Sequence, residues 1–251
     1  LDKNLAQFIS RALQKEEILK EFKQFLLTNG FPEIINAEKE IILKYINETI
    51  IDRIIYKDLS DITGAQNIST IRSIFNILFN NPGQIIEINS LAKEIGASRH
   101  SLSNYLEYLE QAYLIKKLYN FSKNTRKTER RLKKYYSAII NPLLIEIDFP
   151  KIFEQSMVMQ LNADYFWRDP YKNEVDIIKT NPLKAIEIKS GEIKERDLLS
   201  LQKFMEKFKP KEAFIISYDI KKTLNNIKII PFYNYLLKSS SSTQFISKET
   251  K

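Results

Sequence analysis

Apolar residues recur at steps of three and four over most of the first 65 residues, which is the spacing of amphipathic α-helices. One such stretch stops at Asn29-Gly30, a usual C-terminal helix signal, and Pro32 prevents the helix from resuming. A second stretch covers residues 41–59. We predict that residues 1–65 form a helical region that supplies core and spacing, since no chemistry-bearing pattern stands in it.

The pattern changes after this region to that of a helix-turn-helix. A short helix is predicted over residues 90–95 with Asn89 as its cap, a tight turn follows at Gly96, and a longer amphipathic helix comes next. These elements, followed by a strand at residues 114–119, are typical of a winged helix, in which that strand begins the wing. Residues 66–137 are therefore predicted to form a winged-helix domain.

The second of these helices would turn polar residues outward, where arginine, serine and asparagine can address base edges or phosphates. The basic stretch from residue 123 to 134 would be the wing. The predicted nucleic-acid contacts on the two elements are Arg99, His100, Ser103, Asn104, Lys123, Arg126, Lys127, Arg130 and Arg131. Winged helices also serve as protein-packing modules, and the same residues are then merely solvated. His100 is the single histidine, so no multi-histidine metal site or histidine-dependent triad can be built.

The last part of the chain has the pattern of an α/β domain with a mixed central sheet, because strand-like segments precede a crossover helix and a buried strand. Strands are expected at residues 165–168, 174–179, 184–189, 213–217 and 227–230, and helices at 151–161, 195–208 and 232–237. The domain covers residues 138–238, and a polar tail without regular structure is predicted over 239–251. The fold class is thus multidomain: an α-helical and winged-helix N-terminal part, then an α/β domain.

Two carboxylates and a lysine carry the most chemistry in this domain. Strand residues alternate sides, so Glu187 and Lys189 share one face, and Asp176 on the preceding antiparallel strand is expected near the level of Glu187. Asp176, Glu187 and a main-chain carbonyl such as that of Ile188 would make an oxygen site for Mg²⁺ or Mn²⁺. Lys189 would position water for in-line phosphodiester hydrolysis, and Glu154 on the preceding helix could assist. The alternative is a surface ion pair of Glu187 and Lys189 without chemistry.

The chain resembles the PD-(D/E)xK nuclease superfamily through Val175-Asp176, a spacer of ten residues, and Glu187-Ile188-Lys189-Ser190-Gly191, with Glu154 upstream. Through residues 29–32, 91–115 and 165–191 it also resembles the C-terminal half of a family of archaeal and bacterial P-loop ATPases related to the AAA type. The resemblance implies lid-like helices over 1–65, a winged helix, a restriction-endonuclease-like domain and an ATPase domain upstream.

The chain departs from that family in two ways. It has no G-x-x-x-x-G-K-[ST], so ATP is expected only in a domain upstream of Leu1. Family members often carry an aspartate after the aromatic pair that corresponds to Tyr135-Tyr136, whereas the nearest polar residue here is Asn141. The linker into the last domain is therefore less well defined by the resemblance.

Composition narrows the function class further. The chain of 251 residues has an apolar fraction of 43% and a charged fraction of 28%, as in ordinary soluble globular proteins. It lacks cysteine, which excludes disulfides and thiolate chemistry, and no apolar run approaches the ~18 residues of a membrane span. The net charge of +8 suits a polyanionic partner, and nine basic residues lie between 116 and 134 against the single acid Glu129. A start at Leu1, inside a predicted helix, indicates the cut end of a longer protein.

Together these patterns predict the C-terminal part of a cytoplasmic ATPase that binds DNA through a winged helix and carries a nuclease-like domain with Mg²⁺-dependent phosphodiester cleavage. The alternative is a non-catalytic DNA- or protein-binding module that regulates the upstream ATPase. Scaffolding within an ATPase oligomer is a third reading. No membrane partner is expected, and assembly of several copies stays open.

Overall fold

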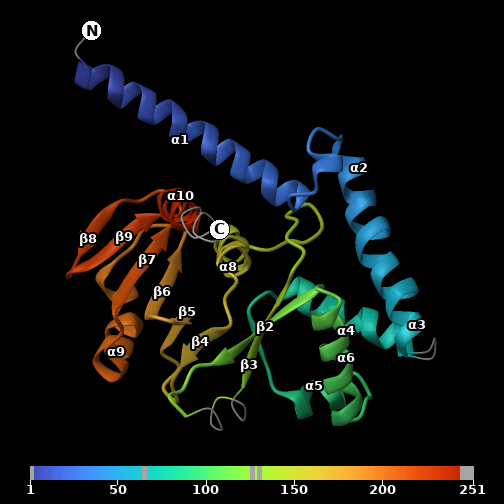
Figure 1. The fold of residues 1–251 in the computed structure, drawn as a ribbon. Coiled ribbons are helices and arrows are strands. Elements are labelled where there is room, and N and C mark those ends of the chain that lie inside the picture. The colour runs from blue at the N-terminus through green and yellow to red at the C-terminus, as the bar shows by residue number, and fades with distance from the viewer. Residues whose placement is uncertain (1–2, 64–66, 125–127, 129–131, 244–251) are drawn as a thin grey trace, which may run out of the picture. The chain divides into compact units, whose positions relative to one another are not determined.

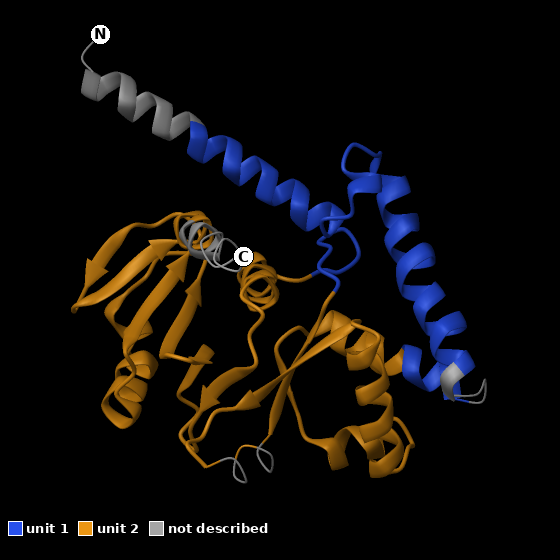
Figure 2. Ribbon diagram, viewed as in Figure 1, with its two compact units in different colours: residues 1–72, 139–146 blue, residues 73–138, 147–251 orange. Residues whose placement is uncertain are grey.

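The computed structural model describes residues 3–63, 67–124, 128 and 132–243. The chain divides into two compact units (Figure 2). Unit 1 consists of residues 1–72 and 139–146, and unit 2 of residues 73–138 and 147–251.

Unit 1 is helical, as the apolar spacing predicted. Its elements are α1 (Lys3–Thr28), η1 (Pro32–Ile34), α2 (Lys39–Lys44), the π-helical segments η2 (Tyr45–Asp52) and η3 (Ile54–Asp58), and α3 (Leu59–Thr63). The prediction of regular α-helix over 41–59 is wrong in one respect. The buried face runs through Ile46, Ile51 and Ile55, and the first of these steps is five residues. A π-helical turn, with its i→i+5 hydrogen bond, keeps that longer step on one face.

The turn after α1 also holds a distant segment of unit 1. Asn29 and Gly30 both adopt positive φ, 52° and 75°, which ends the helix where the sequence predicted. The Asn29 side-chain oxygen accepts a hydrogen bond from the N–H of Ile140 (2.8 Å), and buried Asn141 donates to the carbonyl of Leu27 (2.5 Å). These bonds fix residues 139–146 to the end of α1, so Asn141 has a structural role.

Unit 2 contains a sheet and the helices that cover it (Figure 1). Its first part, entered through α4 (Ile68–Asn80), contains β1 (Gln84–Ile86), α5 (Ile88–Glu94), α6 (Arg99–Gln111), β2 (Ile115–Asn120) and β3 (Lys133–Ser137). Its second part contains α8 (Phe149–Gln160), β4 (Tyr165–Arg168), β5 (Glu174–Thr180), β6 (Leu183–Lys189), η5 (Glu195–Leu198), α9 (Leu199–Phe208), β7 (Glu212–Ser217), β8 (Lys222–Leu224), β9 (Ile227–Pro231) and α10 (Phe232–Thr243).

Among the described residues, nine strands form one mixed sheet in the order β1-β3-β2-β4-β5-β6-β7-β9-β8. The predicted mixed α/β architecture is thereby confirmed, and β4 and β5 form an antiparallel hairpin. The two parts of unit 2 meet where β2 runs parallel to β4, with Tyr119 paired to Tyr165 and Asn120 to Phe166. The predicted segments 66–137 and 138–238 therefore contribute strands to the same sheet.

Helices cover both faces of the second part of the sheet. Ile215 of β7 lies in a core cluster with Phe204 and Phe208 of α9. The neighbouring Phe214 packs instead against Tyr235 of α10, with ring centroids 5.2 Å apart and the rings tilted. Because adjacent strand residues point to opposite faces, α9 and α10 lie on opposite sides. α8 shares the side of α10, since the rings of Phe153 and Phe232 are in contact.

Three boundaries differ from the prediction. α5 is capped by Glu87, whose carboxylate accepts from the N–H groups of Asn89 and Ser90, so Asn89 is already inside the first turn. The strand β8 was not predicted, and α10 continues past Ser239 to Thr243, where a tail without regular structure was predicted. In the described part of the chain, no helix is both long and apolar enough to cross a membrane.

Candidate metal and catalytic site

Asp176 and Glu187 lie where β5 and β6 stop pairing. The ladder pairs Ile178 with Ala185 and Ile177 with Ile186, so the next step along both strands brings Asp176 opposite Glu187. The N–H of Ile188 donates to Asp176 Oδ2 at 2.8 Å, which ties the two strands at this point through a side chain. The predicted meeting of Asp176 and Glu187 at one level is confirmed.

An irregularity in the β4–β5 ladder falls at the same place. Tyr165 pairs with Ile178, but Trp167 pairs with Val175, so the register shifts by one residue. Asp176 sits in the shifted stretch of β5. Bulges of this kind re-aim a side chain, and they are common beside active sites. The alternation of the sequence does not reveal this feature.

Lys189 and Glu187 form an ion pair on the same side of β6. Lys189 Nζ lies 2.8 Å from Glu187 Oε1. Lys189 is partly exposed, whereas Glu187 is buried. The reading of this pair as a mere surface ion pair is therefore wrong, because its carboxylate lies inside the protein.

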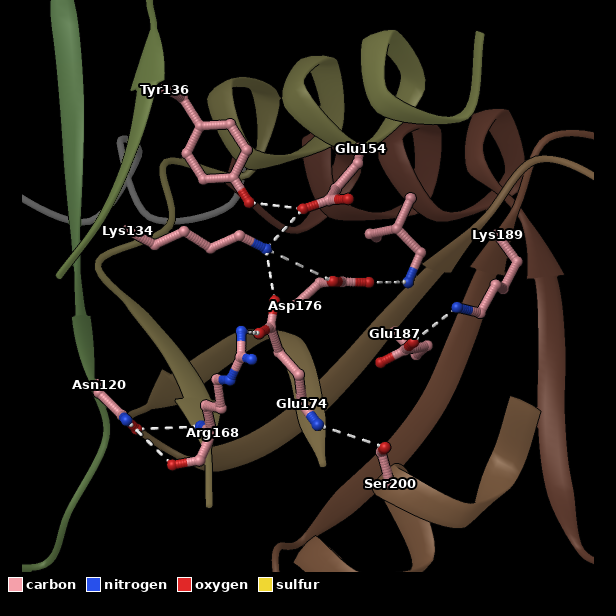
Figure 3. Close-up of polar contacts among 11 residues, drawn as sticks. Asn120, Lys134, Tyr136, Glu154, Arg168, Glu174, Asp176, Glu187, Lys189 and Ser200 are labelled. Atoms are coloured by element: carbon pink, nitrogen blue, oxygen red, sulfur yellow. Dashed lines mark hydrogen bonds and ion pairs between the residues drawn. The ribbon is translucent and has the colours of Figure 1, made fainter. Parts of the chain in front are cut away.

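A second lysine, Lys134, enters the site from β3. Its Nζ lies 2.8 Å from Glu154 Oε1, 2.7 Å from Glu174 Oε1 and 3.9 Å from Asp176 Oδ1 (Figure 3). The Tyr136 hydroxyl, two residues along the same strand, donates to Glu154 Oε1 at 2.6 Å. The structure thus joins the predicted Glu154 and Asp176 to three residues that sequence reasoning missed.

Lys134 was predicted to be the last residue of a basic wing that could meet phosphate, and its burial excludes that contact. Its side chain is buried, since only 5% of it is exposed, and it also lies 5.9 Å from the centre of the Phe166 ring. One signal was available in the sequence: Lys134 and Tyr136 are two apart in a strand and therefore share a face. If the tyrosine points into the protein, a lysine on the same face of the strand points inward too.

Electrostatics in the Lys134 cluster favour full ionisation. Burial alone would lower the pKa of Lys134, but electrostatic interactions with Tyr136, Glu154, Asp176 and Glu174 outweigh it and raise that pKa well above its usual range. Burial likewise raises the pKa of Glu154. The charge of Lys134 and the hydrogen bonds from Lys134 and Tyr136 outweigh this effect, so the pKa is lowered on balance. Glu154 is therefore held as a carboxylate by Lys134.

Asp176 and Glu187 are in the opposite situation. Burial, with the nearby carboxylates Glu187 and Glu154, raises the pKa of Asp176 well above its ordinary value. Burial raises the pKa of Glu187 to about 7, although Lys189 opposes the shift. Glu187 Oε2 is buried and has no hydrogen-bond partner among the described residues. Lys189 and Lys134 therefore compensate this pair less fully than Lys134 compensates Glu154.

The orphaned oxygen and the raised pKa values fit a divalent cation held by Asp176 and Glu187. In the described part of the chain, no group of three or more histidine, cysteine, aspartate or glutamate side chains is arranged to hold a metal ion. Mg²⁺ does not require one, because it keeps several waters and is usually bound through one or two carboxylates. The residues present therefore suit Mg²⁺ or Mn²⁺ with water completing the coordination.

An outer layer of contacts holds the acidic cluster in place. Arg168 donates to Glu174 Oε2 at 3.1 Å, and the N–H of Glu174 donates to Ser200 Oγ at 3.3 Å. Asn120 of β2 donates to the carbonyl of Arg168 (2.9 Å) and accepts from its N–H (3.0 Å). A cavity of about 560 Å³ beside this layer is lined by Asn120, Arg168 and Lys172, among others.

The predicted nucleic-acid contacts fall partly on the surface of α6. Arg99, His100 and Ser103 are exposed and Asn104 is half-buried, while Leu102 on the other side of the helix is buried. Lys123 is exposed, and Arg126, Lys127, Arg130 and Arg131 lie outside the described residues. Not all of the basic run is free to meet phosphate. Its remaining described members include internally paired lysines: Lys116 with Asp164, Lys117 with Glu110, and Lys134 as above.

Comparison with known proteins gives relatives but no established activity. Residues 19–138 match the model of a family described as a domain of unknown function (DUF8612). The match contains Lys134 and Tyr136 but ends before the carboxylates of the site. No solved structure matches the chain.

Three curated relatives are uncharacterized proteins. The chain is 40% identical to uncharacterized protein MJ1544 of Methanocaldococcus jannaschii over 45% of its own length and 27% of that protein. It is 23% identical to MJ1637 of the same organism over 94% of its length and 54% of that protein. An uncharacterized protein of Haemophilus influenzae is 28% identical over 41% of the chain and 27% of the relative. The chain thus spans about a quarter to a half of the relatives it matches.

Proposed function

We propose that the chain binds DNA through a winged helix formed by α4–α6 and β1–β3, and that it hydrolyses phosphodiester bonds at a restriction-endonuclease-like site formed by Asp176, Glu187 and Lys189. The observation that carries the proposal is the buried, unpartnered Glu187 Oε2 next to Asp176, at the place where two strands part. A buried carboxylate oxygen without a partner is costly unless a cation satisfies it. Together with Lys189, such a bound cation would make the site suited to phosphoryl chemistry.

Each residue has a distinct role in this mechanism. Asp176 and Glu187 would hold Mg²⁺ or Mn²⁺, which when bound supplies Lewis acidity toward a phosphate oxygen. Asp176 is oriented by the N–H of Ile188, and Glu187 by Lys189. Lys189 is exposed enough to reach substrate, where its charge offsets that developing on the phosphate and its N–H groups orient a water. Glu154 is occupied by Lys134 and assists only indirectly.

Cleavage of linear, branched and single-stranded DNA in the presence of Mg²⁺ or Mn²⁺ tests the proposal. Asp176→Asn and Lys189→Met should each lower the rate about a hundredfold or more, because each removes one charged group that stabilises the transition state. Lys184→Met is the matched control, since Lys184 on the same strand pairs with Glu212 at the surface. Equal rates in wild type and both site variants would reject the assignment.

A second candidate is favoured by Lys134 itself. Its ammonium group already pairs with both Glu154 and Glu174, so these two carboxylates have a counterion without any metal ion or substrate. The chain would then be a non-catalytic DNA- or protein-binding module that regulates an ATPase. Salt-dependent DNA binding together with no cleavage under any of these conditions would select this candidate.

The resemblance to AAA-related ATPases implies, for both candidate functions, that the full-length protein has a P-loop domain upstream of this chain. The chain covers only 54% of MJ1637, and the remainder of such relatives is where that domain is expected. A P-loop motif in that remainder, with ATP hydrolysis by the purified full-length protein, would support the extension. The nuclease candidate does not depend on this extension, and neither does the DNA or protein binding of the second candidate.

A further inference from the structure

We infer that Lys134 is a built-in cation that takes the place of a second divalent ion, so that the site accepts one metal ion only. The inference rests on the proposed metal site at Asp176 and Glu187, and it adds a positioning residue contributed by a different part of the chain. Its basis is the geometry around one atom, Lys134 Nζ.

Three carboxylate oxygens converge on that atom. Glu154 Oε1 and Glu174 Oε1 are within 2.8 Å, and Asp176 Oδ1 is at 3.9 Å. Carboxylate oxygens bind divalent ions at about 2.0–2.6 Å, so an ion at this point would need only modest movement of the first two. Two-metal phosphodiesterases hold their ions about 3.5–4 Å apart, with a carboxylate between them. Asp176, which faces both Lys134 and Glu187, has the place of that shared carboxylate.

The lysine is fixed in this position. Its backbone pairs on both sides, with Ile85 of β1 and Leu118 of β2, and its side chain is enclosed by Tyr136 and Phe166. The Tyr136 hydroxyl also occupies Glu154 Oε1. A divalent ion would have to displace an ammonium group held by two short ion pairs. Glu187 Oε2, on the far side of Asp176, remains without a partner in the described structure.

The geometry therefore divides the cluster into two cation positions. One is filled by Lys134 and the other is open between Asp176 and Glu187. Lys134 balances charge and positions Asp176, and it acts through this carboxylate without touching the reacting phosphate. Since Lys134 belongs to β3, the charge balance of the site depends on the strand that precedes residues 138–238.

Counting bound Mn²⁺ tests the inference. Electron paramagnetic resonance of free Mn²⁺, titrated into the whole chain, should give one bound ion in wild type and in Lys134→Arg, and two in Lys134→Met. Lys184→Met, the surface control, should bind one. The second ion bound by Lys134→Met should be absent from the double variant Lys134→Met/Glu154→Gln. This variant removes one negative charge together with the positive one, so it should fold even where Lys134→Met does not.

An equal ion count in wild type and Lys134→Met, with both proteins folded by circular dichroism, would overturn the inference. Two ions in wild type would overturn it as well. If Lys134→Met does not fold, the Mn²⁺ affinity of Glu154→Gln is measured instead. An affinity within about threefold of wild type supports the inference. A tenfold or greater loss of affinity makes Glu154 a metal ligand and overturns the inference. The proposed function fails separately, if Glu187→Gln binds as many ions as wild type does.

Discussion

Lys134 illustrates how a single side chain can carry the charge balance of a buried cluster. Removing it leaves Glu154 and Glu174 without their shared ammonium group, and Asp176 with less compensation. Breaking a buried pair by deleting one partner costs about 3–5 kcal/mol. Glu154 and Glu174 are each about a quarter exposed, and Arg168 still holds Glu174, so the cost should be lower here.

We therefore expect Lys134→Ala to lower the free energy of unfolding by about 2–4 kcal/mol in urea titrations. Lys184→Ala, which breaks a partly exposed pair with Glu212, should cost less than about 1 kcal/mol. Similar losses in the two variants would show that the Lys134 cluster is solvated.

Glu187 gives the site a pH dependence with a definite sign. Its pKa is raised from 4.5 to about 7, so between these values the folded chain retains a proton that the unfolded chain has released. Metal-free stability should therefore fall as pH rises through this window and level off above it. The raised pKa of Asp176 acts in the same direction, while Lys189, Glu154 and Lys134 are the charged groups that face the pair.

Glu187→Gln should flatten this slope. In chelator-treated buffer, the free energy of unfolding of Glu187→Gln minus that of wild type should rise by on the order of 1–3 kcal/mol as the pH increases from 4 to 8. Thermal unfolding at a series of pH values measures the difference. Parallel curves for the two proteins would mean that Glu187 ionises normally.

At the same scale, the sequence predicted Asp176, Glu187 and Lys189 from strand alternation and spacing, and Glu154 from its place on the helix before these strands. It did not predict Lys134 or Glu174. The residues of this cluster come from three different elements, β3, α8 and β5. Lys134 is 20 residues from Glu154 in the sequence and 40 residues from Glu174. Local patterns hold no information on which charges meet over such distances.

At the scale of elements, the narrow connection is the one between β2 and β4. It consists of two residue pairs, the backbone bonds Tyr119 N–H to Asp164 and Phe121 N–H to Phe166, and the two hydrogen bonds between Asn120 and the backbone of Arg168. Asn120 is buried at this junction. Its side chain therefore replaces ladder bonds that β4, with its irregular pairing, does not make.

Asn120→Ala should lower stability by about 1–3 kcal/mol, because it leaves a backbone N–H and a carbonyl of Arg168 unpaired. Amide exchange should accelerate at Arg168 and Phe121 before it does so in β7. Asn80→Ala is the control: Asn80 donates one exposed hydrogen bond to Asn76, and its loss should cost less than about 0.5 kcal/mol. Unchanged exchange at Arg168 would contradict the role given to Asn120.

Element prediction succeeded where the signal is local. The helix end at Asn29-Gly30 and the strands β5 and β6 follow from turn residues and periodicity. It failed at the π-helical turns, where one step of five residues shifts the buried face, and at the cap of α5. Glu87 lies before the expected cap, and glutamate is not among the usual N-cap residues.

At the scale of the whole molecule, charge supports the proposed DNA contact. Each phosphate contact contributes about 0.9 to the slope of log affinity against log salt for duplex DNA. We expect Arg99→Ala/Lys123→Ala to weaken duplex binding and reduce that slope by about 1–2. Lys228→Ala on β9, an exposed lysine near the other end of the strand order, should change neither. An unchanged slope in the double variant would place the contact elsewhere.

The overall assembly of elements was only partly predictable. The mixed α/β character follows from strands interrupted by a crossover helix. The union of β2 with β4 does not, because pairing between strands so far apart in the chain leaves no mark in either sequence. For this reason the segments 66–137 and 138–238 look independent in the sequence and share one sheet in the structure.

The continuous sheet has a practical consequence for anyone who divides this chain. A fragment cut between Ser137 and Ala138 would uncover one flank of β2, and the complementary fragment would uncover β4. Open strand edges invite pairing with other molecules, and so promote domain swapping and aggregation. Lys134 would leave with the first fragment, which deprives the carboxylates of their counterion at the same cut. Aggregation or domain swapping of either fragment would then result from the place of the cut, and would say little about the fold of the intact chain.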